Sequence, residues 1–274
     1  MTLSGENLAL GYTPGTLVVD DQSVTIPAAR VTVIVGPNAC GKSTLLRGLA
    51  GLMRPSSGRV LLDGSEIARL PATELARRLG MLPQQPSTPD GITVADLVGR
   101  GRHPHQRWFR QWSADDEAAV SAALHATGTA ELADRPVAEL SGGQRQRAWI
   151  ALVLAQGPGT MLLDEPTTFL DLAHQLDVLD LLRAVNAEQR RTIVMVLHDL
   201  ELAARYADHL IAMRDGRIVA EGAPSAVVTE ELVASVFGVD ALVTPDPLTG
   251  TPLVLPRPGA RRHADAAGLR DQEI

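Results

Sequence analysis

Residues 31–51, VTVIVGPNACGKSTLLRGLAG, decide the fold of this chain. A β-branched run from Val31 to Val35 predicts a strand that breaks at Gly36, and a helical pattern begins at Lys42, with Leu45, Leu46 and Leu49 at helical spacing. The loop between them matches the pattern G-x-x-x-x-G-K-[ST] at every fixed position, and it lies between a strand and a helix as that pattern requires. We interpret it as a phosphate-binding loop.

The residue types of the loop fit that chemistry. Gly36 and Gly41 let the backbone turn its N–H groups towards a polyphosphate, and the next helix presents further free N–H groups. Lys42 can reach the β- and γ-phosphates, and the Ser43 hydroxyl can ligate Mg²⁺. An ordinary glycine-rich turn is disfavoured because later motifs agree with the loop independently. The predicted nucleotide-binding loop consists of Gly36, Pro37, Asn38, Ala39, Cys40, Gly41, Lys42, Ser43 and Thr44.

Composition indicates a globular chain that can bury a full core. The chain has 274 residues, of which 45% are hydrophobic, and a net charge of −7 that argues against a surface built to hold nucleic acid. No apolar run approaches the roughly 18 residues that span a bilayer. The first residues lack the features of a secretory signal, and the lone Cys40 has no partner for a disulfide. We therefore expect a cytosolic protein, and we interpret Cys40 as a small side chain that fills a tight turn.

Strand and helix patterns alternate on both sides of a helical stretch. Strand patterns occur at 3–10, 17–26, 59–62, 79–83, 160–163 and 192–197, whereas helical patterns dominate from Gln84 to about Gly157. We predict an α/β P-loop core with a mostly parallel sheet, an N-terminal antiparallel β subdomain, and a helical subdomain inserted at about residues 85–157. Residues 244–274 are rich in Pro, Gly, Ala and Arg without periodicity, so we expect a loosely ordered tail.

Three chemically informative positions follow strand ends of the predicted sheet. Gly36, Asp164 and His198 each come after an apolar strand, and ligands of parallel sheets gather at that edge. Asp164 can hold Mg²⁺, while Glu165 can polarise a water for in-line attack on a γ-phosphorus. Adjacent acids also occur simply as helix N-terminal charges, but the phosphate loop favours the functional interpretation.

Tyr12 lies in a turn that precedes the core strand. Its ring could stack on an adenine, since stacking requires no base-specific hydrogen bond. An exposed tyrosine in a turn is otherwise an ordinary loop residue. The nearby phosphate loop favours the adenine role.

The segment LSGGQRQR, residues 140–147, predicts a second helix start that can bind an anion. Ser141 is an N-cap residue type, and the glycines expose N–H groups. This segment belongs to the helical lobe, whereas the phosphate loop belongs to the core. A head-to-tail dimer with nucleotide between the two surfaces would bring both to one triphosphate.

In this order and spacing, the phosphate loop, LSGGQRQR, TMLLDEP (160–166), TTFLD (167–171) and VLHD (196–199) resemble the nucleotide-binding subunit of an ATP-binding-cassette (ABC) transporter. The resemblance covers about residues 3–240, and we assign residues 1–243 to an ABC-type ATP-binding domain. It implies hydrolysis of ATP with Mg²⁺ by a homodimer of ATPase subunits. It also implies an integral membrane permease, indirect contact with a substrate-binding protein, and a place on the cytoplasmic face of the cell membrane.

The family's roles carry over to matching positions. The resemblance implies that Gln84 senses Mg²⁺ and the attacking water, that Glu165 is the base, and that His198 holds the γ-phosphate. It implies catalytic roles for Glu165, His198, Gln84 and Lys42, metal ligation by Ser43, Gln84 and Asp164, and ATP contacts from Tyr12, the phosphate loop, Ser141, Gly143 and Asp171. Ser141, Gly143 and Asp171 would act across the dimer interface. Ala39 replaces a glycine often seen in this family, and Phe169 replaces a more usual Ala or Tyr.

A narrower resemblance concerns the transported cargo. The segments LPQQP (82–86), GRGRHPHQ (99–106) and TTFLDLAHQ (167–175) resemble the ATPase subunits of ferric-siderophore importers, a group shared with haem and cobalamin uptake. We therefore expect siderophore uptake, with haem or cobalamin as alternatives. A soluble ABC ATPase that acts on DNA or the ribosome is disfavoured by the modest helical insertion and the single cassette. A regulator without turnover is disfavoured by the complete set of catalytic residues.

The Arg100–Trp112 segment combines four arginines with Trp108, Phe109 and Trp112. Such a mixture suits a surface for another protein or for lipid head groups. A solvated loop with a few packed aromatics is an equal alternative.

Overall fold

The structure is a computed structural model that describes residues 2–13, 15–87, 89–106 and 112–261. Its strands are β1 (Leu3–Leu10), β2 (Val19–Ile26), β3 (Val31–Val35), β4 (Ser57–Leu62), β5 (Ser65–Glu66), β6 (Leu79–Leu82), β7 (Thr160–Asp164), β8 (Thr192–Val196), β9 (His209–Arg214), β10 (Arg217–Gly222), β11 (Val239–Pro245) and β12 (Pro252–Arg261). Its α-helices are α1 (Lys42–Leu49), α2 (Ala72–Arg78), α3 (Val94–Gly99), α4 (Ala114–Ala126), α5 (Gly142–Gln156), α6 (Leu172–Gln189), α7 (Leu200–Tyr206), α8 (Pro224–Val227) and α9 (Glu230–Phe237).

The central sheet has the strand order β10-β9-β3-β8-β7-β6, and only the edge pair β9–β10 is antiparallel. In register, Val196 of β8 lies beside both Ile34 of β3 and Asp164 of β7. The carboxyl ends of these three strands are therefore level. Gly36 and His198 come after β3 and β8, and Asp164 is the last residue of β7, with Glu165 next, so the three positions that the sequence predicted share one edge of the sheet.

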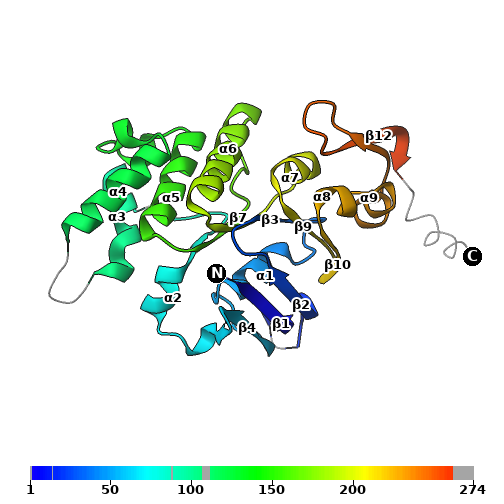
Figure 1. The fold of residues 1–274 in the computed structure, drawn as a ribbon, viewed down its shortest axis with the longest axis horizontal. Coiled ribbons are helices and arrows are strands. Elements are labelled where there is room, and N and C mark those ends of the chain that lie inside the picture. The colour runs from blue at the N-terminus through cyan, green and yellow to red at the C-terminus, as the bar shows by residue number, and fades with distance from the viewer. Residues whose placement is uncertain (1, 14, 88, 107–111, 262–274) are drawn as a thin grey trace, which may run out of the picture.

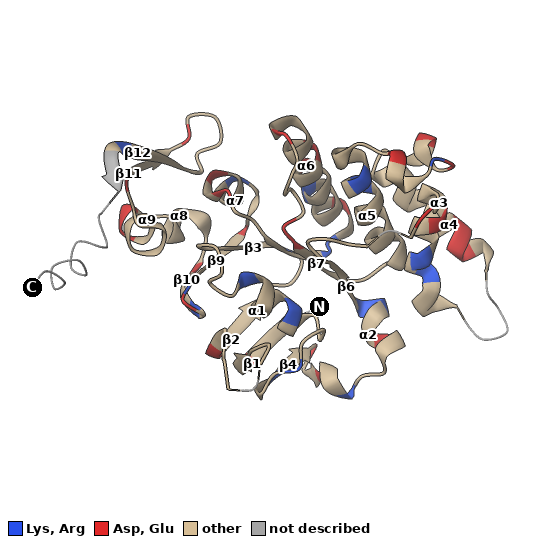
Figure 2. Ribbon diagram, turned by 180° about the vertical axis from the view of Figure 1, so that it is seen from behind, with Lys and Arg blue, Asp and Glu red and all other residues tan. Residues whose placement is uncertain are grey.

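Both faces of the sheet are covered. Val31, Val33 and Val35 of β3 face a core shared with α6, α7 and α9, whereas Ile34 faces a core shared with α1 and the antiparallel sheet β2-β1-β4-β5. Alternate residues of a strand point to opposite faces, so a strand buried on both sides is apolar throughout. Figures 1 and 2 show α1 between the two sheets from either side.

The helices α3, α4 and α5 form a helical lobe at one end of the molecule (Figure 1). Val94, Val120 and Ile150 are buried between them. Ser113 begins α4 and Ser141 begins α5, each through a capping box in which the serine hydroxyl accepts an N–H and the third helical residue bonds back. The α/β fold with an antiparallel subdomain and inserted helices is thus confirmed, while the exact boundaries of the subdomains stay a prediction.

The expected loose tail from residue 244 is wrong for residues 244–261. There β11 and β12 form an antiparallel hairpin in which Leu242 lies opposite Leu255. Asp246 Oδ1 closes the turn by accepting the Leu248 and Thr249 N–H groups. The prolines of β12 argued against a strand in the sequence, because proline has no N–H to donate to a ladder. In a two-stranded hairpin, however, one side of each strand makes no ladder bonds, so prolines are tolerated there. Residues 262–274 lie outside the described residues.

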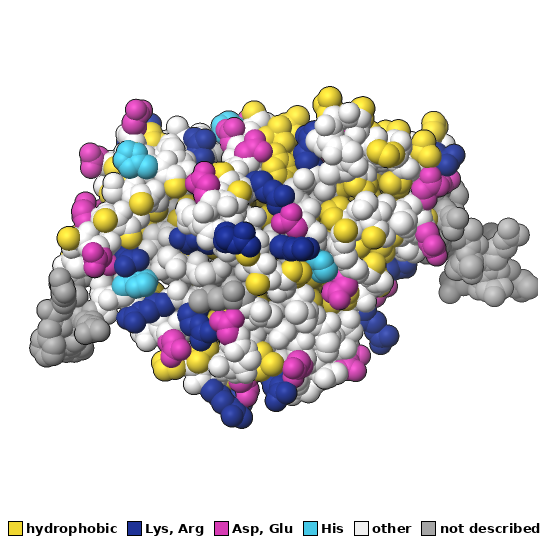
Figure 3. Space-filling model, viewed as in Figure 1, with side chains coloured by type: hydrophobic (Ala, Val, Ile, Leu, Met, Phe, Trp, Pro, Cys, Tyr) yellow, Lys and Arg dark blue, Asp and Glu magenta, His cyan; other side chains and the backbone are white. Residues whose placement is uncertain are grey.

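Charge is unevenly distributed on the surface. Figure 3 shows Lys and Arg side chains in a row across the middle of one face, although the chain has a net charge of −7. Local basic regions therefore exist on an acidic protein. Among the described helices, none is both long and apolar enough to cross a bilayer.

Candidate functional site

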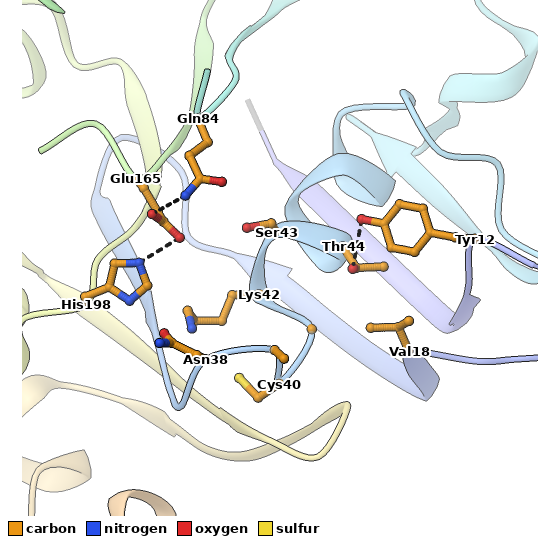
Figure 4. A pocket seen from close by; sticks show the side chains of 12 residues that line it. Tyr12, Val18, Asn38, Cys40, Lys42, Ser43, Thr44, Gln84, Glu165 and His198 are labelled. Carbon is orange, nitrogen blue, oxygen red and sulfur yellow. Dashed lines mark hydrogen bonds and ion pairs between the residues drawn. The ribbon is translucent and has the colours of Figure 1, made fainter. Parts of the chain in front are cut away.

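A pocket of about 510 Å³ opens at the carboxyl edge of the central sheet. It is lined by Tyr12, Val18, Asn38, Ala39, Cys40, Gly41, Lys42, Ser43, Thr44, Gln84, Glu165 and His198. Figure 4 shows Gln84, Glu165 and His198 on one side, the start of α1 in the middle, and Tyr12 at the far end. Side chains that are up to 186 residues apart along the chain therefore surround one cavity.

The loop from Gly36 to Gly41 wraps around the lysine ammonium. Lys42 Nζ donates to the carbonyl oxygens of Gly36 (2.9 Å) and Pro37 (2.8 Å). Gly36 has a φ of 151°, and a Cβ there would lie 2.2 Å from the Met213 carbonyl oxygen, so no other residue fits. Ala39 has a φ of 62°, which explains why a glycine suits this position and implies modest backbone strain here.

Ser43 and Asp164 form a polar pair between α1 and β7. Ser43 Oγ donates to Asp164 Oδ1 at 2.7 Å, while Oδ2 is buried without a hydrogen bond and has only the Arg47 guanidinium at 3.8 Å. Burial raises the pKa of Asp164 above its usual range, against the opposing effects of Ser43 and Arg47. A hydroxyl beside a buried carboxylate with an unsatisfied oxygen is a donor set that Mg²⁺ prefers, so these residues fit the ion.

Glu165 is held by three side chains. His198 Nε2 lies 2.7 Å from Oε1, while Gln84 Nε2 (2.5 Å) and Thr168 Oγ1 (3.0 Å) donate to Oε2. Burial alone would raise the pKa of this carboxyl, but the hydrogen bonds from His198, Thr168 and Gln84 lower it below its usual value. Glu165 therefore carries its charge at neutral pH. Its φ of 53° turns the chain sharply at the end of β7.

Tyr12 stands at the opposite end of the pocket from Glu165 (Figure 4). Its hydroxyl lies 3.3 Å from Thr44 Oγ1 and accepts from Arg47 NH1 at 3.3 Å. These bonds fix the phenol oxygen on α1, while 61% of the residue stays exposed. An exposed ring of fixed orientation is suited to stacking against a planar base.

Ser141, Gly143 and Asp171 do not line this pocket. They lie together elsewhere, where α5 begins and the 167–171 loop leads into α6. Ser141 Oγ accepts the Gln144 N–H, and Asp171 Oδ1 accepts the His174 N–H, so both residues are N-caps. The predicted nucleotide-binding residues thus divide into two separate sets, as the head-to-tail hypothesis requires.

Two contacts of the site were missed by sequence reasoning. Thr168 bonds the carboxylate of Glu165, and Arg47 lies beside Asp164. Arg47 is four residues after Ser43, so the same face of α1 could have revealed it. Thr168 lay within a quoted motif, but its partner depends on the turn at Glu165, for which the sequence carries no signal.

The Arg100–Trp112 segment is only partly described, because residues 107–111, with Trp108 and Phe109, lie outside the described residues. Arg102 is no free surface charge: its Nε donates to Asp116 Oδ1 at 2.8 Å and its NH1 to the Ala155 carbonyl at 2.8 Å. Trp112 donates its indole N–H to Glu117 at 2.9 Å. These two residues therefore secure the helical lobe, which removes Arg102 from the expected basic surface.

Comparisons with known proteins agree with this geometry. Residues 19–168 match the family model described as ABC transporter. A probable siderophore transport system ATP-binding protein of Bacillus subtilis (strain 168) is 56% identical over 254 residues, which cover 93% of this chain and 92% of the relative.

Two solved structures have the same fold. An inward-facing metal-chelate type ABC transporter superposes with a TM-score of 0.80 at 28% identity, covering 93% of this chain and 97% of the other. A dimeric bacterial ABC transporter cassette superposes with a TM-score of 0.72 at 27% identity, covering 81% and 98%. Both similarities extend over more than four fifths of this chain.

Proposed function

Because the chain belongs to the ABC transporter family as an ATP-binding subunit that hydrolyses ATP, we propose that two copies close head to tail on two ATP molecules. This closure drives uptake of a ferric siderophore through a separate membrane permease. The single observation that supports this most is the division of the nucleotide-binding residues into two sets. One set lines the pocket at the sheet edge, and the other lies where α5 and α6 begin.

Within the pocket each group has a chemical task. The N–H groups at the start of α1 and Lys42 bind the phosphates, while the Tyr12 ring stacks on the adenine. Glu165, kept ionised by its hydrogen bonds, takes a proton from the attacking water, and His198 and Gln84 lie beside it to contact the γ-phosphate and that water. Ser43, Asp164 and Gln84 would hold Mg²⁺, which supplies charge neutralisation for the leaving phosphate.

The second set completes the site from the partner copy. Ser141 and the N–H groups at the start of α5 form an anion-binding helix end on the surface. A dimer of this kind is supported by the likeness to a dimeric cassette. In it, Ser141, Gly143 and Asp171 of one copy face the nucleotide of the other, and neither copy alone surrounds the triphosphate.

The cargo is proposed from the relatives, since the cargo does not touch this pocket. The relative at 56% identity is named for siderophore transport, and the neighbour at a TM-score of 0.80 is of the metal-chelate type. We infer an integral membrane permease as direct partner, a substrate-binding protein as indirect partner, and a place on the cytoplasmic face of the membrane.

The motor is tested with the Glu165→Gln variant. It should bind ATP, lose hydrolysis and accumulate as a dimer in MgATP, measured by light scattering; undiminished turnover would reject Glu165 as base.

Lys42→Ala should weaken ATP binding, because each charge-assisted phosphate contact contributes about 1.5–3 kcal/mol.

For the cargo, a deletion strain should fail to grow on at least one iron chelate as sole iron source, and normal growth on all of them would redirect the search to haem or cobalamin.

A further inference from the structure

His174 joins the two surface motifs of the proposed dimer half-site. It is the third residue of α6, and its backbone N–H donates to Asp171 Oδ1 at 2.9 Å. Its ring nitrogen Nδ1 lies 2.7 Å from the same oxygen. One residue therefore binds a single carboxylate oxygen twice, once through the backbone and once through the ring.

The same imidazole lies against the start of α5. A Cβ placed on Gly143 would lie 2.4 Å from His174 Cδ2 and 2.8 Å from Cγ, so the ring occupies the space of any side chain at position 143. Gly142 is less crowded, because a Cβ there would lie 3.5 Å from Leu170 Cδ2, which is an ordinary contact distance. Of the two glycines of LSGGQ, it is therefore Gly143 that close packing against the 167–175 segment requires.

The proton arrangement follows from the partners. A carboxylate only accepts hydrogen bonds, so Nδ1 of His174 carries the proton in this contact. The two bonds from His174 lower the pKa of Asp171, which keeps that carboxylate ionised. The contact is therefore charge-assisted, although Asp171 is exposed and solvent weakens it.

We propose that His174 is a positioning residue for ATP hydrolysis: its ring clamps Asp171 and Gly143 together so that both meet the partner copy's nucleotide as one rigid unit. The inference rests on the proposed head-to-tail dimer. His174 lies outside the pocket of its own copy. Its loss should therefore leave the binding of ATP to a single copy unchanged and weaken only what happens when two copies close.

Contacts at both ends of the 167–171 loop support this positioning role. Gln175 Nε2 donates to the Leu170 carbonyl at 2.9 Å, and Thr168 donates to Glu165 at the other end. The 167–171 loop is thus bonded to Glu165, the proposed general base of its own copy, at one end, and it contacts LSGGQ through His174 at the other. Phe169 between them is 86% exposed with a φ of 64°, so its side chain does not hold this stretch in place.

The test compares His174→Ala with His174→Asn, whose side-chain N–H₂ can replace the Nδ1 donor. The matched control is His125→Ala, an exposed histidine on α4. Three quantities are measured: ATP affinity of the monomer at low protein concentration, the kcat of ATP hydrolysis, and the dimer dissociation constant in MgATP when each change is added to Glu165→Gln.

We expect His174→Ala to weaken the dimer and to lower kcat by about tenfold or more, as loss of a charge-assisted bond on each side predicts, with monomer ATP affinity unchanged. His174→Asn should recover most of the loss, and His125→Ala should behave as wild type.

The positioning role alone is overturned if Glu165→Gln dimerises, the double variant with His174→Ala dimerises equally tightly, and His174→Ala by itself has an unchanged kcat. A drop in monomer ATP affinity equal to the drop in kcat would overturn it in favour of a folding effect. If Glu165→Gln itself never dimerises, the proposed dimer fails and this inference with it.

Discussion

His198 Nε2 lies 2.7 Å from Glu165 Oε1, so the residue expected at the γ-phosphate is bonded to the residue expected to activate water. Gln84 and Thr168 hold the other carboxylate oxygen. Contacts from His198 or Gln84 to a nucleotide would therefore replace bonds to Glu165. We therefore expect nucleotide binding to free the Glu165 carboxylate from these hydrogen bonds, because each N–H can serve one partner at a time.

The stability that Glu165 contributes should disappear only in acid. Its pKa in the folded protein is lower than its usual value of 4.5, so this stability is fully present above that value and is lost as the pH falls through the folded pKa. The melting temperatures of wild type and Glu165→Gln, measured from pH 7 to pH 4, should differ by a constant amount down to about pH 5 and then converge. Glu188→Gln, at an exposed position of α6, should follow wild type throughout. A difference that grows towards low pH would contradict the arrangement around Glu165.

Asp164→Asn should raise the melting temperature of the nucleotide-free chain while abolishing Mg²⁺-dependent hydrolysis. Burial raises the pKa of Asp164, so its ionisation costs stability, and this cost develops as the pH rises from the ordinary value of 3.8 through the folded pKa. Asparagine does not ionise and keeps an oxygen that can accept from Ser43. Calorimetry in EDTA and then in MgATP separates the two effects. A lower melting temperature in EDTA would mean that Arg47 stabilises the carboxylate more than burial opposes it.

Tyr12→Ala should weaken ATP binding by about 1–3 kcal/mol, the value of one base stacked on an aromatic ring. Tyr12→Phe should bind nearly as tightly as wild type, because it loses only the 3.3 Å contacts of the hydroxyl with Thr44 and Arg47. Titration with ATP and with a triphosphate that lacks a base distinguishes stacking from an indirect effect on α1. If both ligands lose affinity equally in Tyr12→Ala, stacking is not the cause.

Local patterns were enough to predict the elements that carry the pocket. The strand β3 begins and ends as expected, and the helix α1 begins at Lys42 as expected, because the apolar spacing and the glycines at 36 and 41 specify these positions. The contacts of Thr168 and His174 were not predictable in this way. The contact of Thr168 depends on a left-handed turn at Glu165, which is not a glycine. Such a turn is imposed by surrounding structure, so a single sequence carries no signal for it. The packing of the His174 ring on Gly143 joins two different helices, which no local pattern indicates.

The hairpin β11–β12 is the element that local patterns missed, and two neighbouring residues test it. Ala241 is 1% exposed and belongs to the main core, whereas Leu242 points to the opposite side and is 45% exposed. Ala241→Asp should bury an unpaired charge and destabilise the fold by about 3 kcal/mol or more, which lowers the melting temperature by about 6 °C or more. Leu242→Asp places the same charge on the exposed face and should change the melting temperature little. A hairpin packed on α9 and α7 must distinguish these two positions, while a loosely attached segment would tolerate both substitutions equally.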